Sequence, residues 1–281
     1  MESGVIFDIK GFALYDGPGI RQTVFFKGCP LRCNWCHNPE GLSAGVQMMV
    51  ATSGCLQCGA CGRVCKHEGC VACGECIPAC PLRLRKLCGI RMTAAQLIER
   101  LRRDADYCAS AGGGVTFSGG EPLMQPAFLQ EVLLGLGDMH KIVETSGYAS
   151  ASVFQAVCGR IDHLIMDIKL ADSAAHAHFT GQGNAPIIEN LRWLIGSGLP
   201  FTVRVPLIPG VTDTRENCHA IARLLHGAEA LDCVELLPYH KTAGAKYAMV
   251  AAAYAPLFDP NQPVACHVEI FEEYGLRSCV L

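Results

Sequence analysis

The sequence predicts an α/β fold, a partial (βα)6 TIM-like barrel that carries one small inserted module. From Thr93 onward, short apolar segments alternate with helical stretches, a pattern typical of a parallel sheet with right-handed crossovers. About six strands are found, fewer than the eight of a closed barrel, so we expect the barrel to be open. Residues 45–89 are instead rich in Cys and Gly with little periodicity, which indicates a module held by metal.

The expected elements follow one another in a regular order. The first buried strand covers residues 20–27, and the barrel comprises residues 1–44 and 90–281 around the insert. A helix is predicted over 93–109, with Thr93 as its N-cap. Five further apolar strands are predicted at 114–118, 140–145, 162–168, 200–207 and 232–237. In TIM-like folds the functional site lies at the carboxyl ends of the strands, where the polar motifs of this chain occur.

Composition restricts the class of protein. The 281 residues are 50% hydrophobic and 17% charged, with a net charge of −3, which is typical of one soluble globular domain. This charge gives no electrostatic reason to expect nucleic acid or an anionic membrane as a partner. The N-terminus lacks the basic and apolar regions of a signal peptide, and no apolar run is long enough to span a bilayer. We therefore expect a cytoplasmic protein.

Eighteen cysteines indicate metal binding. A disulfide framework is typical of small secreted domains, a class that this chain does not fit. Eleven of the cysteines fall between Cys29 and Cys80 at short spacings, so their sulfurs can converge on inorganic centres. The scattered Cys residues elsewhere are expected to be small buried hydrophobes.

The first cysteine group follows the first strand with the spacing C-x3-C-x2-C, at Cys29, Cys33 and Cys36. Three thiolates on a four-iron cluster leave one iron open to a substrate. The alternative is a zinc or structural cluster site that takes a fourth ligand from elsewhere, with His37 as the nearest candidate.

This group resembles the signature of the radical S-adenosylmethionine (SAM) superfamily, in which Trp35 matches the aromatic position. The resemblance implies that Cys29, Cys33 and Cys36 hold a 4Fe–4S cluster whose open iron binds SAM. It further implies reductive cleavage of SAM to methionine and a 5′-deoxyadenosyl radical. The Gly-Gly-Glu motif of the family is matched by Gly119, Gly120 and Glu121 directly after the second strand.

Other matches occur in the family's order at later strand ends. Val143–Gly147 stands where activating enzymes carry Asp-Thr-Asn-Gly, with Glu144 and Ser146 departing from that pattern. The motif contributes to SAM binding or to a monovalent cation site. Further matches are an Asp-x-Lys pair, an arginine inside an apolar strand, which needs an anionic partner, and a histidine after the last strand. The resemblance assigns SAM contacts to Trp35, Cys36, His37, Gly119, Gly120, Glu121, Thr145, Asp167, Ile168, Lys169, Arg204 and His240.

The segment Asp16–Arg21, read together with the cysteine motif and the following His-Asn-Pro, resembles the activating enzymes of glycyl radical enzymes. The resemblance implies that the deoxyadenosyl radical abstracts a hydrogen atom from a backbone glycine of a partner enzyme. It also implies reduced flavodoxin or ferredoxin as electron donor and a monomeric protein.

The insert contains two runs of four cysteines with the spacing C-x2-C-x2-C-x3-C, which is the bacterial ferredoxin pattern. In that pattern the fourth cysteine of each run ligates the other cluster. The predicted ligand sets are Cys55, Cys58, Cys61 and Cys80 for one 4Fe–4S cluster and Cys65, Cys70, Cys73 and Cys76 for the other. Zinc is the alternative. The insert is abbreviated, because only four residues separate the runs and Lys66 replaces the expected proline.

Three functions remain open from the residues alone. The first is an activating enzyme with three 4Fe–4S clusters, one of them coordinated by SAM. The second is a radical SAM enzyme that oxidises a small molecule or a peptide. The third is an iron–sulfur electron-transfer protein, which would need neither the Gly-Gly-Glu motif nor the Asp-x-Lys pair. The insert would relay electrons or shape the partner interface.

Overall fold

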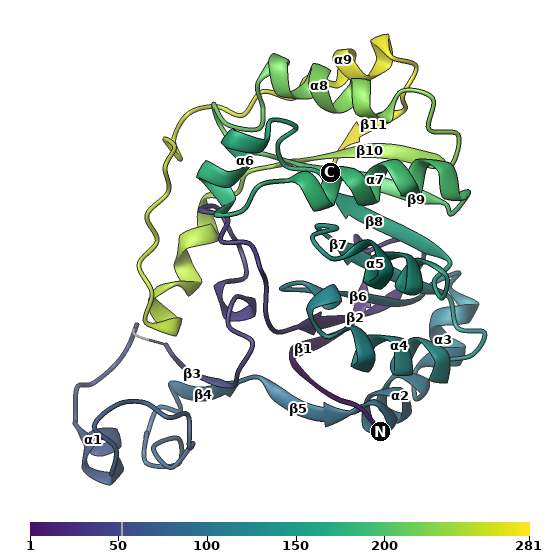
Figure 1. The fold of residues 1–281 in the computed structure, drawn as a ribbon. Helices are drawn as coiled ribbons and strands as arrows, with labels where there is room; N and C mark the ends of the chain where they lie inside the picture. Colours follow the sequence, from purple (N-terminus) through teal and green to yellow (C-terminus); the bar gives the residue numbers. More distant parts are fainter. Residues whose placement is uncertain (52) are drawn as a thin grey trace.

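A nine-stranded sheet runs through the computed structural model, which describes residues 1–51 and 53–281 (Figure 1). The strand order is β11-β10-β9-β8-β7-β6-β2-β1-β5. Its central six strands are parallel, as the sequence predicts. They are β2 (Arg21–Phe26), β6 (Gly114–Gly119), β7 (Lys141–Thr145), β8 (His163–Asp167), β9 (Phe201–Leu207) and β10 (Leu231–Pro238).

Helices follow the parallel strands and pack along one face of the sheet (Figure 1). This arrangement is an α/β fold consistent with a partial TIM barrel. The helices between and after these strands are α4 (Pro126–Gly135), α5 (Ala151–Cys158), α6 (Ser173–Thr180), α7 (Ala185–Ser197), α8 (Arg215–Leu225) and α9 (Val268–Glu273). Short 3-10 turns are η1 (Pro39–Gly41), η2 (Pro122–Met124), η3 (Lys241–Lys246) and η4 (Ala248–Val250).

The sheet is mixed, which the sequence analysis did not anticipate. Strand β1 (Ser3–Ala13) runs antiparallel to β2, and β5 (Ile90–Thr93) runs antiparallel to β1. At the other edge, β11 (Ser278–Val280) pairs with β10 in parallel. These strands extend the sheet on both sides of the barrel strands, and two of them come from the ends of the chain.

The helix predicted over 93–109 is two helices, α2 (Ala94–Arg102) and α3 (Ala105–Ser110). Its predicted N-cap is confirmed, because the Thr93 hydroxyl accepts a hydrogen bond from the Gln96 amide at 3.3 Å. The Gln96 side chain accepts in return from the Thr93 amide at 2.9 Å. This reciprocal pair satisfies two amides that the first helical turn leaves without a partner.

Alternation along each barrel strand separates apolar from polar side chains. On β9, Val203 and Val205 are fully buried in the main core beside Leu194 of α7. Arg204 lies between them and points to the opposite face, because successive side chains of a strand alternate. The inner face of the sheet is therefore polar, and it is this face that lines the functional cavity.

The insert forms a separate unit beside β5 (Figure 1). It contains a two-stranded antiparallel sheet of β3 (Gln47–Val50) and β4 (Arg85–Cys88), and a single short helix, α1 (Ala60–Val64). Lys27 connects the barrel to the start of the insert. Its fully buried ammonium donates to the Glu40 carbonyl at 2.6 Å and to Gln47 Oε1 at 3.1 Å. Within the described residues, no helix is long and apolar enough to cross a membrane.

Candidate functional site

The first cysteine group lines one side of a cavity of about 630 Å³ at the carboxyl ends of the barrel strands. Its loop leaves β2 through Gly28, whose φ of +94° favours glycine. Backbone hydrogen bonds hold the loop, from Gly28 to the Gly41 carbonyl (2.8 Å) and from Arg32 to the Thr180 carbonyl (2.7 Å). The sulfurs that the sequence spaces three and four residues apart thus face one space.

The three cysteines are suited to ligate a cationic metal centre rather than to exist as free thiolates. Burial raises the pKa of Cys29 and of Cys33 to about 12, and it also raises the pKa of Cys36. Such thiols stay protonated at neutral pH until a metal centre replaces the proton. Over the ranges 1–51 and 53–281, no three His, Cys, Asp or Glu side chains form a group that could hold a single metal ion.

His37, the candidate fourth ligand of the alternative, lies on the same cavity. Its ring centroid is 6.0 Å from that of Tyr239. Burial is the main reason why the pKa of His37 lies below its ordinary value. A neutral ring of this kind serves as a flat wall beside the cysteines. Trp35, in the aromatic position of the motif, also lines the cavity and is almost fully buried.

The two glycines of the Gly-Gly-Glu motif lie directly against the cysteine loop. A Cβ on Gly120 would come within 2.4 Å of the Gly28 carbonyl oxygen, and Gly119 has a φ of +118°. The next amide, of Glu121, donates to the same Gly28 carbonyl at 2.7 Å. Only glycine permits this close approach of two backbones.

Glu121 itself does not line the cavity. Its fully buried carboxylate accepts hydrogen bonds from the Thr145 hydroxyl (2.6 Å), the Ser146 hydroxyl (2.6 Å) and the Ser146 amide (2.9 Å). Burial raises the pKa of Glu121, and these hydrogen bonds oppose the rise. The Glu121 carboxylate therefore connects the loop after β6 to the end of β7 and the loop that follows it. Ser146, which departs from the family pattern, is one of the donors to this carboxylate. Thr145 reaches the cavity.

Asp167 and Lys169 meet at the end of β8, as their spacing predicts. The Lys169 ammonium donates to Asp167 Oδ2 at 2.9 Å, and both residues line the cavity. Burial favours the neutral amine of Lys169, but Asp167 and the neighbouring Cys33 outweigh it and raise its pKa above the ordinary value. Ile168, between them, is buried in the core and does not line the cavity.

Arg204 lines the cavity, and its anionic partners are side chains of this chain. It donates to Glu144 Oε1 at 2.5 Å, to Glu235 Oε2 at 2.6 Å and to the Tyr15 carbonyl at 2.6 Å. Ser118 donates to the second Glu144 oxygen at 2.5 Å. Both carboxylate oxygens of Glu144 thus accept hydrogen bonds, and Glu144 itself lines the cavity.

His240 lies outside the cavity wall. It is exposed and caps the 3-10 turn η3, where its ring accepts from the Thr242 amide. The preceding residue, Tyr239, lines the cavity in its place, with its hydroxyl 2.9 Å from that of Tyr254. Sequence reasoning missed Tyr239 and Ser118. The polar Thr116 and Ser118, alternating with apolar residues of β6, were a signal for the second of these.

Two smaller cavities lie in the insert. One, of about 200 Å³, is lined by four cysteines: Cys55, Cys58, Cys61 and Cys80. The other, of about 250 Å³, is lined by Cys65, Cys70, Cys73 and Cys76 and also by Cys61, which therefore lines both cavities. Arg85 borders both, and its guanidinium lies 3.8 Å from the Cys76 sulfur.

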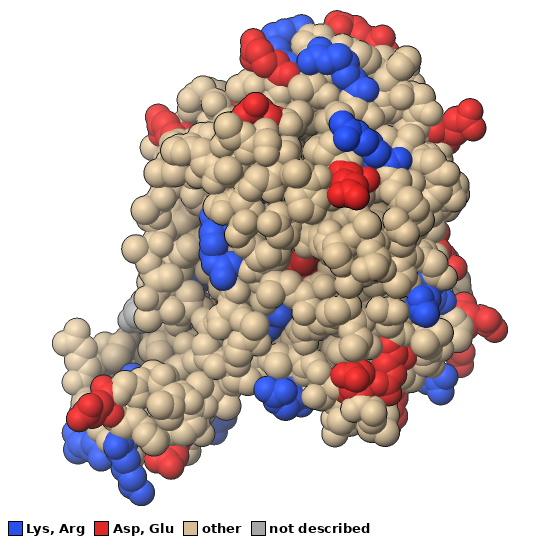
Figure 2. Space-filling view, in the orientation of Figure 1, with Lys and Arg blue, Asp and Glu red and all other residues tan. Residues whose placement is uncertain are grey.

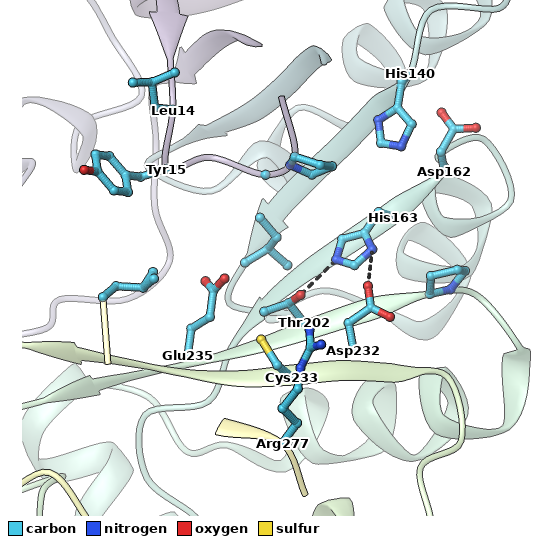
Figure 3. Close-up of a pocket in the computed structure, with 15 residues that line it drawn as sticks. Leu14, Tyr15, His140, Asp162, His163, Thr202, Asp232, Cys233, Glu235 and Arg277 are labelled. Atoms are coloured by element: carbon cyan, nitrogen blue, oxygen red, sulfur yellow. Dashed lines mark hydrogen bonds and ion pairs between the residues drawn. The ribbon is translucent and has the colours of Figure 1, made fainter. Parts of the chain in front are cut away.

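A further cavity, of about 480 Å³, lies at the opposite ends of the barrel strands (Figure 3). His163 points into it between Thr202 (3.0 Å) and Asp232 (3.5 Å). Tyr15 and Leu281 border this cavity as well as the cysteine cavity. None of the residues assigned to SAM lines it.

Comparison with known proteins agrees with this geometry. Residues 23–219 match the family described as the Radical SAM superfamily. The choline trimethylamine-lyase activating enzyme of Oleidesulfovibrio alaskensis is 36% identical, over 89% of this chain and 88% of that protein. The isethionate sulfite-lyase activating enzyme of the same organism is 38% identical, over 87% of this chain and 86% of that protein.

Another relative, the 4-hydroxyphenylacetate decarboxylase activating enzyme of Clostridioides difficile, is 36% identical over 89% of this chain and 86% of that protein. Among solved structures, a domain of the pyruvate-formate lyase-activating enzyme from Bacteroides vulgatus superposes with a TM-score of 0.50 at 28% identity, covering 60% of this chain and 99% of that domain. The chain therefore belongs to the radical SAM superfamily and, within it, to the activating enzymes of glycyl radical enzymes.

Proposed function

We propose that this chain binds SAM in the cavity of about 630 Å³, at a 4Fe–4S cluster held by Cys29, Cys33 and Cys36, to activate a glycyl radical enzyme. The observation that carries this proposal is that the three cysteines share one cavity with Gly119, Gly120 and the Asp167–Lys169 pair. When bound, the group supplies the chemistry: one electron breaks the sulfonium C–S bond, methionine departs, and the deoxyadenosyl radical takes a hydrogen atom from a glycine Cα, giving 5′-deoxyadenosine and a glycyl radical.

The residues of this chain bind and orient the reactants. Lys169 presents a buried cation beside Cys33 and is the natural partner of the SAM carboxylate. Because Gly119 and Gly120 carry no Cβ, the end of β6 packs directly against the backbone of Phe26 and Gly28, and both glycines lie at the cavity wall. Trp35 and His37 supply flat walls, and no residue has to act as acid or base. Glu121, Ile168 and His240 support the cavity from outside its lining.

For the insert, we propose a 4Fe–4S cluster in each of its two cavities, with the crossed ligand pairing of bacterial ferredoxins. Support comes from the lining of the first cavity, which contains Cys80 from the second run, and of the second, which contains Cys65 from the first. Residues 45–89 then act as a ferredoxin-like module on the barrel of 1–44 and 90–281. The proposal includes a monomer reduced by flavodoxin or ferredoxin in the cytoplasm.

The partner is proposed as a class only. The relatives' names give three different partners at 36–38% identity, so this similarity does not choose among them. The cavity must admit a glycine loop of another protein, and the surface loops around it decide which one. The alternative, oxidation of a small molecule, predicts release of 5′-deoxyadenosine without a protein radical.

The test is anaerobic reconstitution followed by reduction with dithionite in the presence of SAM. We expect 5′-deoxyadenosine, about twelve irons per chain and, with the cognate partner, a glycine-centred EPR doublet. Cys33→Ser should abolish SAM cleavage, whereas Cys266→Ser, at an exposed position far from any cluster motif, should leave it unchanged. Absence of 5′-deoxyadenosine from the reconstituted wild type would refute the proposal, and about four irons would refute the two insert clusters.

A further inference from the structure

Charge is divided unequally between the insert and the barrel. Residues 45–89 contain five basic side chains, Arg63, Lys66, Arg83, Arg85 and Lys86, and two acidic ones, Glu68 and Glu75, a formal charge of +3. The whole chain carries −3, so the remaining residues carry −6. A basic module on an acidic body attracts acidic partners to the module and repels them from the body.

The basic side chains of the insert are accessible. Lys66, Arg83 and Lys86 are all exposed, and none of them makes a hydrogen bond or ion pair with the described side chains. Figure 1 shows the insert standing out from the barrel, and Figure 2 shows Lys and Arg side chains gathered at its outer end, at lower left. This end is free for contact with another protein.

Exposed apolar side chains lie beside the same charges, on the rims of the cysteine cavities. Leu56 and Leu82 border the first cavity and are 69% and 45% exposed; Val71 borders the second and is 61% exposed. Leu87 on β4 is 40% exposed. Apolar groups at the centre of a polar rim are typical of protein contact surfaces, and small contacts of this kind suit transient electron-transfer partners.

We propose that the outer face of the insert at the cysteine cavities, formed by Leu56, Leu82, Lys66 and Arg83, docks a small acidic flavoprotein that delivers the electron. The proposal rests on the function proposed above. The reduced flavin loses one electron to a cluster of the insert, and that electron passes to the SAM-bound cluster, where it is consumed in breaking the C–S bond. The apolar rim suits the methyl-bearing edge of a flavin ring, and the basic groups suit the acidic surface around it.

The test compares two ways of reducing the same reconstituted enzyme. The variant combines Lys66→Gln and Arg83→Gln. Its control combines Arg192→Gln and Arg223→Gln, which removes two exposed charges from the barrel helices. Formation of 5′-deoxyadenosine is measured with reduced flavodoxin at several concentrations and ionic strengths, and separately with dithionite.

We expect the KM for flavodoxin to rise about tenfold in the insert variant at low ionic strength, with a smaller difference at high salt. Dithionite-driven cleavage and iron content should match the wild type, and the barrel control should behave as the wild type throughout. If the double variant loses iron, Arg83→Gln alone, at an exposed position, repeats the comparison with an expected rise of about twofold.

An unchanged KM for flavodoxin would overturn the proposal. So would a loss of glycyl radical yield with flavodoxin-driven cleavage intact, because the surface would then serve the glycyl radical enzyme. An effect with acidic ferredoxin but not with flavodoxin would overturn the flavin assignment. Failure of the proposed function is distinguishable, because the wild type would then release no 5′-deoxyadenosine with dithionite.

Discussion

Replacing Arg204 by Met tests whether the charge group at the wall of the cysteine cavity stabilises the fold. The side chain is almost fully buried and donates to Glu144, Glu235 and the Tyr15 carbonyl at 2.5–2.6 Å. Without it, two neighbouring carboxylates lose their cation. Removing one partner of a buried ion pair costs about 3–5 kcal/mol, and since both glutamates are 19% exposed, we expect the lower end of that range. About 3 kcal/mol corresponds to a fall of about 6–12 °C in Tm for a chain of this size.

The assay is thermal unfolding of matched reconstituted samples. Arg204→Lys keeps the charge but not the forked geometry, so its Tm should fall about half as far. Adding Glu144→Gln to Arg204→Met removes one of the unpaired charges, and the double variant should recover part of the loss. A Tm of Arg204→Met within about 2 °C of the wild type, or a double variant no more stable than Arg204→Met, would refute the reasoning.

Three further predictions concern the glycine contact, a buried histidine and the insert. Gly120→Ala should lower the free energy of unfolding by about 1–3 kcal/mol and weaken SAM binding, because the new Cβ would meet the Gly28 and Gly41 carbonyls at 2.4 and 2.5 Å. The control is Gly45→Ala, at a position with open space around it. Equal urea midpoints of unfolding for the two variants would contradict the contact. His176→Asn should reduce the loss of folding stability that occurs below about pH 6.5. Burial lowers the pKa of His176 in the folded chain, so the stability that the neutral ring contributes is present above the pKa of the unfolded chain and is lost as pH falls. An unchanged pH profile of unfolding would count against this. Arg85→Gln should make the reduction potential of the cluster at Cys76 more negative, because it removes a charged donor 3.8 Å from the Cys76 sulfur. The potential is measured by an EPR-monitored redox titration, with Arg83→Gln as the control. Identical potentials in the two variants would exclude an effect of the Arg85 charge on the cluster.

Local spacing was enough to predict much of this protein. The cysteine motif, the glycines that follow β6 and the Asp167–Lys169 pair are each defined within a few residues, and the structure brings all of them to one cavity. The alternation of short apolar segments with helical stretches also predicted the parallel strands, because consecutive strands of one sheet that are joined by helices run parallel. The crossed ligand pairing in the insert stays a prediction, although the lining of each cavity includes a cysteine from the other run.

Partnerships between distant residues were not available from local patterns. The sequence analysis expected the anionic partner of Arg204 to be SAM, but the structure supplies Glu144 and Glu235, which lie 60 and 31 positions away. It expected Glu121 and His240 at the cofactor, but one is buried beneath the loop after β7 and the other caps an exposed turn. Strand pairing of β1 and β5 was likewise missed, because it depends on edge contacts rather than on periodicity.

The sequence by itself determined the chemistry of this protein: which atoms can hold iron, and at which strand ends they stand, because ligand type and spacing are covalent properties of the chain. Only the tertiary structure decided which polar side chains face the cavity and which of them neutralise one another there. That choice depends on the register of neighbouring strands, where Arg204 lies opposite both Asp167 and Glu235. Its guanidinium pairs with Glu235 and Glu144, whereas Asp167 pairs with Lys169, because each buried charge must find its partner within reach.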